Sequence, residues 1–307
     1  MRILSTTIWI KMAIVTAGNE SYHVDQKLMD LWETNSLKNL DEQNIDKAYI
    51  VDGRERIGKS TWTIQQMGAL EPSVFDSVET FLSRICLTAE EFNNTCKEVK
   101  NGVVVFDEGF RGLSSRAALS KTNKKIIQTL MEMGQNNNII FIVSPSIFLL
   151  DVYPAMMRSD GLFHIVQDKK NRKLRTWQGY NRSDKNKIYQ LGIRKGWKFA
   201  FGSKFRGRFF HKFPGGKKFS DAYEAKKRRS WEDKEEEEKV DKFMLQRNIL
   251  LAKWYEEPLI YNTQNRQSFR KYSAYLKNLG ITLSRTELAK IRKKTPEKLE
   301  NTAIGNL

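Results

Sequence analysis

The chain has 307 residues, of which 40% are hydrophobic, and a formal net charge of +17. This apolar content excludes a chain that is disordered throughout and is enough for one large domain with a smaller appendage. The two cysteines, Cys86 and Cys96, are too few for a disulfide framework or a four-ligand zinc site, and they fit a reducing compartment.

The charge is unevenly distributed along the chain. Residues 1–160 contain 17 Lys and Arg against 20 Asp and Glu, whereas residues 161–307 contain 36 against 16. The two halves therefore carry −3 and +20. A strongly basic half indicates contact with a polyanion, and nucleic acid is favoured over the alternative, an anionic membrane surface.

Residues 1–44 are expected to form an N-terminal arm and helix. The apolar run over residues 8–15 is short and contains Lys11, so it predicts a strand or a packing arm instead of a signal peptide. An amphipathic helix is predicted over residues 24–37. No other segment approaches the roughly 20 apolar residues of a membrane-spanning helix, so we expect no transmembrane segment.

The apolar, β-branched run over residues 47–51 predicts a buried strand, and the pattern G-x-x-x-x-G-K-S follows it. In this pattern backbone N–H groups surround phosphate oxygens, the lysine neutralises them, and the hydroxyl binds magnesium. Residues 60–67 can continue as a helix whose N-terminus adds partial positive charge. We therefore predict a loop that binds a nucleoside triphosphate, formed by Gly53, Arg54, Glu55, Arg56, Ile57, Gly58, Lys59, Ser60 and Thr61.

A second strand, over residues 103–106, ends on Asp107 and Glu108. A magnesium-bound phosphate chain needs one carboxylate for the metal's water shell, and hydrolysis needs a second one to orient and deprotonate water. We expect Asp107 to hold Mg²⁺ together with Ser60, and Glu108 to act as general base. Without the preceding loop, the same pair would be interpreted as a solvated strand end.

Further strands are predicted over residues 84–87, 138–145 and 162–166, with a helix over 123–134. In a parallel sheet ligands bind at the carboxyl ends of the strands, so Ser144 would lie beside the two carboxylates. It could sense the γ-phosphate or simply cap the next turn. Alternating strands and helices predict an α/β fold, with a mainly parallel central sheet flanked by helices, over an ATPase core at residues 45–167.

A basic, aromatic-rich extension is expected over residues 168–256. Turn residues at 167–172 predict a hairpin between 162–166 and 173–177. Residues 161–219 contain 17 basic and two acidic residues with interleaved aromatics. Cations on phosphates with aromatics on bases suit single-stranded nucleic acid, and the cations alone suit a duplex. Alternatively, the aromatics form a small core and the lysines a solvated face. The candidate nucleic-acid contacts are Lys198, Lys204, Arg206, Arg208 and Lys212.

The C-terminal part of the extension is expected to be mainly helical. Residues 221–256 have blocks of opposite charge that are typical of an exposed helix or a subunit contact. A small helical region over residues 257–307, with helices at 264–279 and 284–294, could be a helix-turn-helix.

The motifs resemble P-loop ATPases that have an extra strand between loop and acidic pair and a catalytic glutamate beside the aspartate. Within them the chain is similar to FtsK/HerA-type DNA translocases, viral genome-packaging ATPases and the Zot-like ATPases of filamentous phages. The resemblance rests on the loop, on Asp107-Glu108-Gly109, on residues 133–138 before the 139–144 strand, and on Arg158 before residues 162–166.

The resemblance implies a homo-oligomeric ring that hydrolyses ATP with Mg²⁺ at subunit interfaces. It also implies an arginine supplied to a neighbouring site, for which Arg116 and Arg158 are equal candidates and an ordinary surface arginine is the alternative. The sequence departs from the family at Arg54, Glu55 and Arg56, which replace small loop residues, and at Ser144, where glutamine or asparagine is expected.

Three functions remain open on these grounds. The first is an ATP-driven DNA translocase or genome-packaging ATPase of a virus or mobile element, with DNA favoured over RNA. The second is a Zot-like assembly or export ATPase with a capsid or membrane-associated partner. The third is an ATP-gated replication loader or partition factor. The expected location is the cytoplasm, that of the host if the chain is viral.

Overall fold

The computed structural model describes residues 12–107, 121–167, 175–230 and 232. The chain divides into two compact units, Met1–Ser230 and Trp231–Leu307, and every element described below belongs to the first. The helices expected over residues 264–279 and 284–294 lie outside the described residues.

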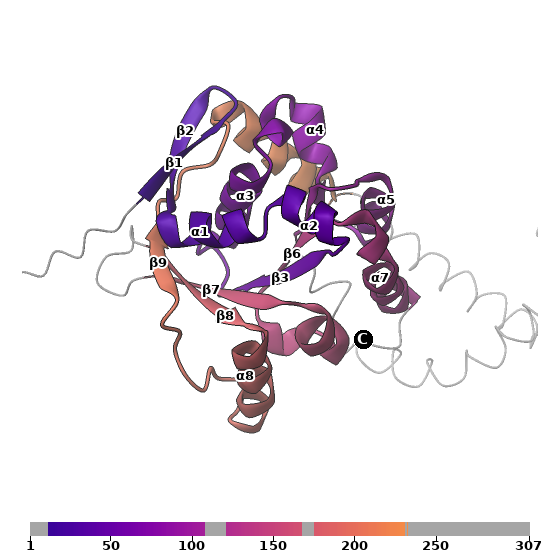
Figure 1. Ribbon diagram of the computed structural model, residues 1–307, viewed down its shortest axis with the longest axis vertical. Coiled ribbons are helices and arrows are strands. Elements are labelled where there is room, and N and C mark those ends of the chain that lie inside the picture. Colours follow the sequence, from indigo (N-terminus) through magenta and orange to yellow (C-terminus); the bar gives the residue numbers. More distant parts are fainter. Residues whose placement is uncertain (1–11, 108–120, 168–174, 231, 233–307) are drawn as a thin grey trace, which may run out of the picture. The chain divides into compact units, whose positions relative to one another are not determined.

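A seven-stranded sheet forms the centre of the first unit, with helices on both faces (Figure 1). The strand order is β4-β5-β6-β3-β7-β8-β9. The pairings from β4 to β7 are parallel, and those that add β8 and β9 are antiparallel. This sheet confirms the predicted α/β fold. Its strands are β3 (Lys47–Asp52), β4 (Ile85–Cys86), β5 (Val103–Phe106), β6 (Ile139–Ser144), β7 (Gly161–Gln167), β8 (Arg175–Asn181) and β9 (Arg206–Phe209).

Strands β5 and β6 are buried at every residue. Strands covered on both faces have unbroken apolar sequences instead of alternating ones, which is why these two could be located from the sequence. In the sheet, β6 lies between β3 and β5. The loop after β3 and the carboxylate after β5 are therefore separated by one strand, as the family resemblance implies.

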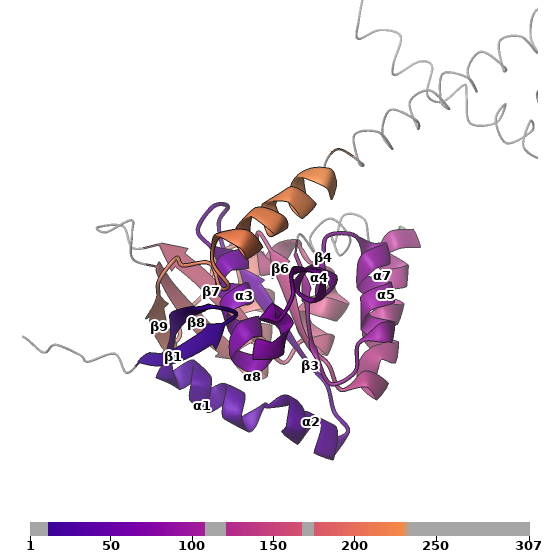
Figure 2. The ribbon, with the colours of Figure 1, turned by 90° about the horizontal axis from the view of Figure 1, so that it is seen from above.

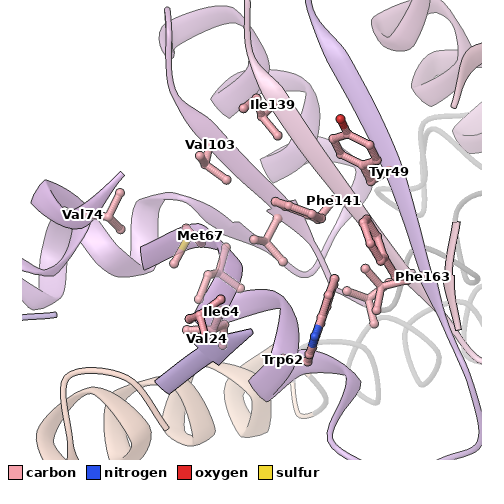
Figure 3. Close-up of a cluster of buried hydrophobic side chains, with 14 of the residues drawn as sticks. Val24, Tyr49, Trp62, Ile64, Met67, Val74, Val103, Ile139, Phe141 and Phe163 are labelled. Atoms are coloured by element: carbon pink, nitrogen blue, oxygen red, sulfur yellow. The ribbon is translucent and has the colours of Figure 1, made fainter. Parts of the chain in front are cut away.

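Alternate residues of the strands supply two separate cores. On one face Tyr49, Phe141 and Phe163 pack around Trp32 and Trp62, as Figure 3 shows in part. Residues of the opposite parity, such as Ile50 and Ile142, belong to the core on the other face. Helices over the first face are α1 (Gln26–Thr34), α2 (Leu37–Gln43), α3 (Lys59–Leu70), η1 (Pro72–Phe75) and α4 (Val78–Ser83). Those over the second are α5 (Ala89–Glu98), α7 (Lys121–Glu132), η4 (Ile147–Leu149), η5 (Tyr153–Arg158) and α8 (Arg182–Arg194).

A separate antiparallel hairpin, β1 (Met12–Ala17) and β2 (Glu20–Asp25), precedes the sheet. The strand predicted near residues 8–15 is thus confirmed from residue 12 onward. The helix predicted over 24–37 is shorter than expected. Asp25 caps its start by accepting the N–H of Lys27, and it ends at Thr34, so residues 37–43 form a second helix.

The predicted hairpin around residues 167–172 is confirmed, because β7 and β8 pair antiparallel along their whole length. The sheet therefore continues across residue 167, where the composition changes. After β9, residues 217–230 are helical, and Figure 2 shows this 217–230 helix in orange. Among the described residues, no helix has the length and apolar character needed to cross a membrane.

Candidate active site

The segment after β3 turns sharply before α3 begins at Lys59. Gly53 and Gly58 have φ of 143° and 92°, values that residues with a side chain rarely adopt. A Cβ on Gly53 would also lie 2.5 Å from the carbonyl oxygen of Ile165. The glycines are therefore required by the backbone, and the predicted order of strand, loop and helix is present.

The side chain of Lys59 lies within this loop. Its Nζ donates hydrogen bonds to the carbonyl oxygens of Gly53 and Arg54, each over 2.8 Å. Burial lowers the pKa of Lys59, and the negative charges of Asp107, Asp52 and Glu55 oppose that shift. The ammonium of Lys59 is therefore partly desolvated and lies at the N-terminus of α3. The positive end of the helix dipole favours an anion at the same place.

Ser60 and Asp107 lie together although they are 47 residues apart. The hydroxyl of Ser60 donates to Oδ1 of Asp107 over 3.2 Å, and the carboxylate is 3% exposed. A hydroxyl and one carboxylate are hard oxygen donors that fit Mg²⁺, which is bound by few protein ligands together with substrate phosphates. The described residues contain no cluster of three or more potential metal ligands from His, Cys, Asp and Glu.

The 217–230 helix also reaches this carboxylate. The hydroxyl of Tyr223 donates to Oδ2 of Asp107, and Nζ of Lys227 lies 3.6 Å from the same oxygen. Lys226 fixes the helix by donating to the carbonyl oxygens of Leu82 and Ile85, over 3.0 and 2.6 Å. Burial and the charge of Asp107 raise the pKa of Tyr223 well above its ordinary value. Tyr223 therefore stays protonated and acts as a donor.

Sequence reasoning missed both Tyr223 and Lys227. The charge blocks of residues 221–256 predict only an exposed helix or a subunit contact. Tyr223 and Lys227 are four residues apart and so share one helical face. The spacing indicates that the two side chains act on the same side of the helix, but it does not indicate which carboxylate they contact.

Asp52, the last residue of β3, forms a second buried network that the sequence did not indicate. Its Oδ1 lies 2.7 Å from Nδ1 of His164 on β7, and its Oδ2 accepts the N–H of Ile147 over 2.9 Å. The carboxylate is completely buried. Because Gly53 follows directly, these contacts anchor the start of the loop to β7 and to the segment after β6.

Ser144 pairs in register with Asp52 at the end of β6, and it is buried. Its hydroxyl donates to the carbonyl oxygen of Ser146 over 3.1 Å. That bond holds Ser144 to the turn after β6, but the N-cap of η4 is Ser146, whose hydroxyl accepts the N–H of Phe148. The two roles considered for Ser144, at the γ-phosphate or as a cap, therefore stay predictions.

Of the two candidate arginines and the predicted general base, the structure describes only Arg158. Glu108 and Arg116 lie outside the described residues. Arg158 forms an ion pair with Asp46, which precedes β3, and its Nε donates to the carbonyl oxygen of Leu130 over 2.8 Å. Arg158 therefore lies near the N-terminal end of β3, whereas the loop follows the C-terminal end of that strand. These contacts hold Arg158 within its own subunit, and its role in a neighbouring site stays a prediction.

The predicted nucleic-acid contacts are mostly exposed. Arg206 and Arg208 project from the edge strand β9, and Lys198 and Lys204 are exposed in the segment before it. Lys212 is bound to the first hairpin, since its Nζ lies 3.0 Å from Glu20.

The aromatic side chains between these cations fall into a packed group and an exposed group. Four pack into the protein, namely Phe199, Phe205, Phe209 and Phe213. Trp197, Phe201 and Phe210 are 49%, 37% and 55% exposed. Both alternatives considered for these aromatics, a small core and a set of exposed rings, are therefore present.

Neither a protein-family model nor a curated protein matches the chain. Solved structures do match it. The N-terminal domain of zonular occludens toxin from Neisseria meningitidis is 17% identical, over 45% of this chain and 84% of that one, with a TM-score of 0.33. B204, the DNA-packaging ATPase from Sulfolobus turreted icosahedral virus, is 12% identical, over 46% and 95%, with a TM-score of 0.31.

The B204 genome-packaging NTPase of Sulfolobus turreted icosahedral virus 2, in complex with ATP-gammaS, is 11% identical over 55% of this chain and 97% of that one, with a TM-score of 0.29. These proteins belong to two of the groups that the sequence motifs resemble. At such identities and TM-scores the likeness assigns no function to the chain.

Proposed function

We propose that the chain is a magnesium-dependent ATPase that works on nucleic acid. One observation carries this proposal. A lysine-bearing glycine loop and a hydroxyl–carboxylate pair, Ser60 with Asp107, meet at the carboxyl edge of a parallel sheet. In open α/β sheets this edge is where ligands bind.

Each residue has a defined task in the proposed site. Lys59 neutralises the β- and γ-phosphates, and the loop's N–H groups surround the phosphate oxygens. Ser60 and Asp107 would hold Mg²⁺, which when bound neutralises charge on the phosphate chain. Glu108, the residue after Asp107, is proposed to orient and deprotonate the attacking water.

The proposed polymer is nucleic acid, with DNA favoured. The support is the charge of +20 on residues 161–307 and the exposure of Arg206 and Arg208 on an edge strand. A homo-oligomeric ring that moves DNA, as in translocation or genome packaging, is the proposed biological form. Arg116 and Arg158 are both proposed as candidates for an arginine acting in a neighbouring subunit.

The test is ATP turnover by the full chain, with and without DNA. We expect turnover to need Mg²⁺, to rise on addition of DNA, and to fall by at least about 100-fold in Lys59→Ala and Glu108→Gln. Glu108→Gln should still bind ATP. A matched control is Glu98→Gln, at the end of α5, which should retain turnover.

Turnover that is unchanged in Lys59→Ala would refute the ATPase assignment. Turnover that is stimulated by anionic vesicles or by a partner protein, but by no form of DNA, would refute a nucleic-acid motor and favour an export ATPase or a loader. Sedimentation with and without ATP measures whether a ring forms.

A further inference from the structure

Arg175, the first residue of β8, lies against the phosphate-binding loop. A Cβ built on Gly58 would be 2.5 Å from Nη1 of Arg175 and 3.4 Å from its Cζ. Gly58 is the N-cap residue of α3, immediately before Lys59. The missing side chain at Gly58 therefore provides the space that the guanidinium occupies.

Two nitrogens of this guanidinium are buried without compensation. Within the part of the chain that the structure describes, Nε and Nη1 of Arg175 have no hydrogen-bond partner. Burial lowers the pKa of Arg175, and no described carboxylate opposes that shift. Arg158, by contrast, is also desolvated but is paired with Asp46. An unpaired buried donor costs free energy, so Arg175 is unfavourable to the empty protein.

His211 lies beside Arg175 on the same flank of the loop. Its Nε2 is 3.1 Å from the hydroxyl of Thr61, and its Cδ2 would be 2.9 Å from a Cβ on Gly58. Burial, followed by the nearby charge of Arg175, lowers the pKa of His211. Two further nitrogen-bearing side chains therefore line the loop.

The flank is opposite to that of the metal carboxylate. Arg175 comes from β8, which follows β7 on one side of β3, whereas Asp107 follows β5 on the other side. Backbone N–H groups of such loops surround the α- and β-phosphates, while the lysine reaches the β- and γ-phosphates. A cation packed on Gly58, with His211 and Thr61 beside it, is placed for the part of the phosphate chain near the nucleoside.

We propose that Arg175 binds a phosphate oxygen on the α/β side of the bound nucleotide, so that the nucleotide is held from both flanks of the loop. This inference rests on the proposed nucleotide site. The nucleotide would supply an acceptor for the Arg175 nitrogens that have no partner among the described residues. Charge-assisted bonds between arginine and phosphate are among the strong ones.

The test is the affinity of the full chain for ATP and for ADP, both with Mg²⁺, by titration calorimetry. Arg175→Met has a side chain of similar length without the hydrogen-bond donors. It should weaken the binding of ATP and of ADP by about 10-fold to 100-fold and leave the ratio of the two affinities unchanged. The affinities of Arg175→Lys should lie between those of the wild type and of Arg175→Met. Arg194→Gln, an exposed arginine at the end of α8, is the matched control and should bind as the wild type does.

Thermal unfolding without nucleotide supplies the second readout. Because two buried donors are removed, the unfolding temperature of Arg175→Met should be equal to or above that of the wild type. If the unfolding temperature falls by many degrees in both Arg175 variants, Arg175 stabilises the fold of the empty protein, and the proposal is overturned.

Unchanged affinity in Arg175→Met would also overturn it, and so would a loss confined to ATP, which would move the contact to the γ-phosphate. If the wild type binds neither nucleotide, the proposed function itself fails. Binding by the wild type with no effect of either variant refutes only the role of Arg175.

Discussion

The contact between Tyr223 and Asp107 leads to a quantitative prediction. Both residues are 3% exposed, so solvent screens their hydrogen bond very little. A hydrogen bond to a charged group contributes about 1.5–3 kcal/mol to stability. Tyr223→Phe keeps the ring and removes only the hydroxyl. We expect it to lower the unfolding free energy of the nucleotide-free protein by about 2 kcal/mol.

The same change should strengthen the binding of magnesium nucleotide. In the empty protein, Oδ2 of Asp107 accepts from Tyr223 and faces the ammonium of Lys227. A metal held by this carboxylate competes with both groups for the same negative charge. If binding releases the tyrosine contact entirely, the full 2 kcal/mol returns as affinity, which corresponds to about 30-fold.

The assay combines denaturant unfolding with calorimetric titration of ADP, in the presence and absence of Mg²⁺. ADP without metal should bind both proteins equally, because Asp107 is assigned to the metal. Tyr189→Phe is the matched control: Tyr189 is buried and donates to the carbonyl oxygen of Leu150 over 3.0 Å, so stability should fall while affinity does not change. Equal or weaker binding of Mg²⁺–ADP by Tyr223→Phe would show that the contact persists in the loaded site and would refute the competition.

Three further predictions concern other parts of the molecule. Gly53→Ala should abolish nucleotide binding and lower the unfolding temperature, because the added Cβ would lie 2.5 Å from the carbonyl oxygen of Ile165. Normal binding of this variant in a nucleotide titration would contradict the strained geometry. Exchanging Arg206 and Arg208 for Gln should reduce the slope of log affinity for DNA against log salt by about 1 per arginine, and an unchanged slope would exclude them as phosphate contacts. Burial lowers the pKa of Lys185 to about 8, so between pH 8 and its ordinary pKa of 10.5 the folded protein loses a proton that the unfolded chain retains. The stability of the wild type should therefore rise with pH in this window by up to about 3 kcal/mol relative to Lys185→Met, and parallel stability curves for the two proteins would refute the shift.

The parts of the fold that could be predicted are those specified by short stretches of sequence. The loop requires its glycines locally, and strands covered on both faces appear as continuous apolar runs, as at residues 103–106 and 139–143. The order of strand, loop and helix, the central sheet and the β7–β8 hairpin all follow from such patterns. The meeting of Ser60 with Asp107 follows from the carboxyl edge that parallel strands share.

The contacts that were missed depend on distant residues. Tyr223 reaches Asp107 across 116 residues, and Arg158 reaches Asp46 across 112. Nothing near Arg158 in the sequence indicates its ion pair with Asp46, so the sequence predicts either an arginine supplied to a neighbouring site or an ordinary surface arginine. Arg175 was not singled out at all, because its position against Gly58 depends on the path of β8 in the folded sheet.

The path of the chain after residue 167 decides how this protein can be divided in the laboratory. Composition suggests a cut at that point, but Trp177, Phe209 and Phe219 fill the core beyond it. A fragment ending at residue 167 would expose this apolar surface to water and would lack Arg175 and Tyr223. The smallest piece expected to remain soluble and to bind nucleotide therefore extends through residue 230, the end of the first compact unit.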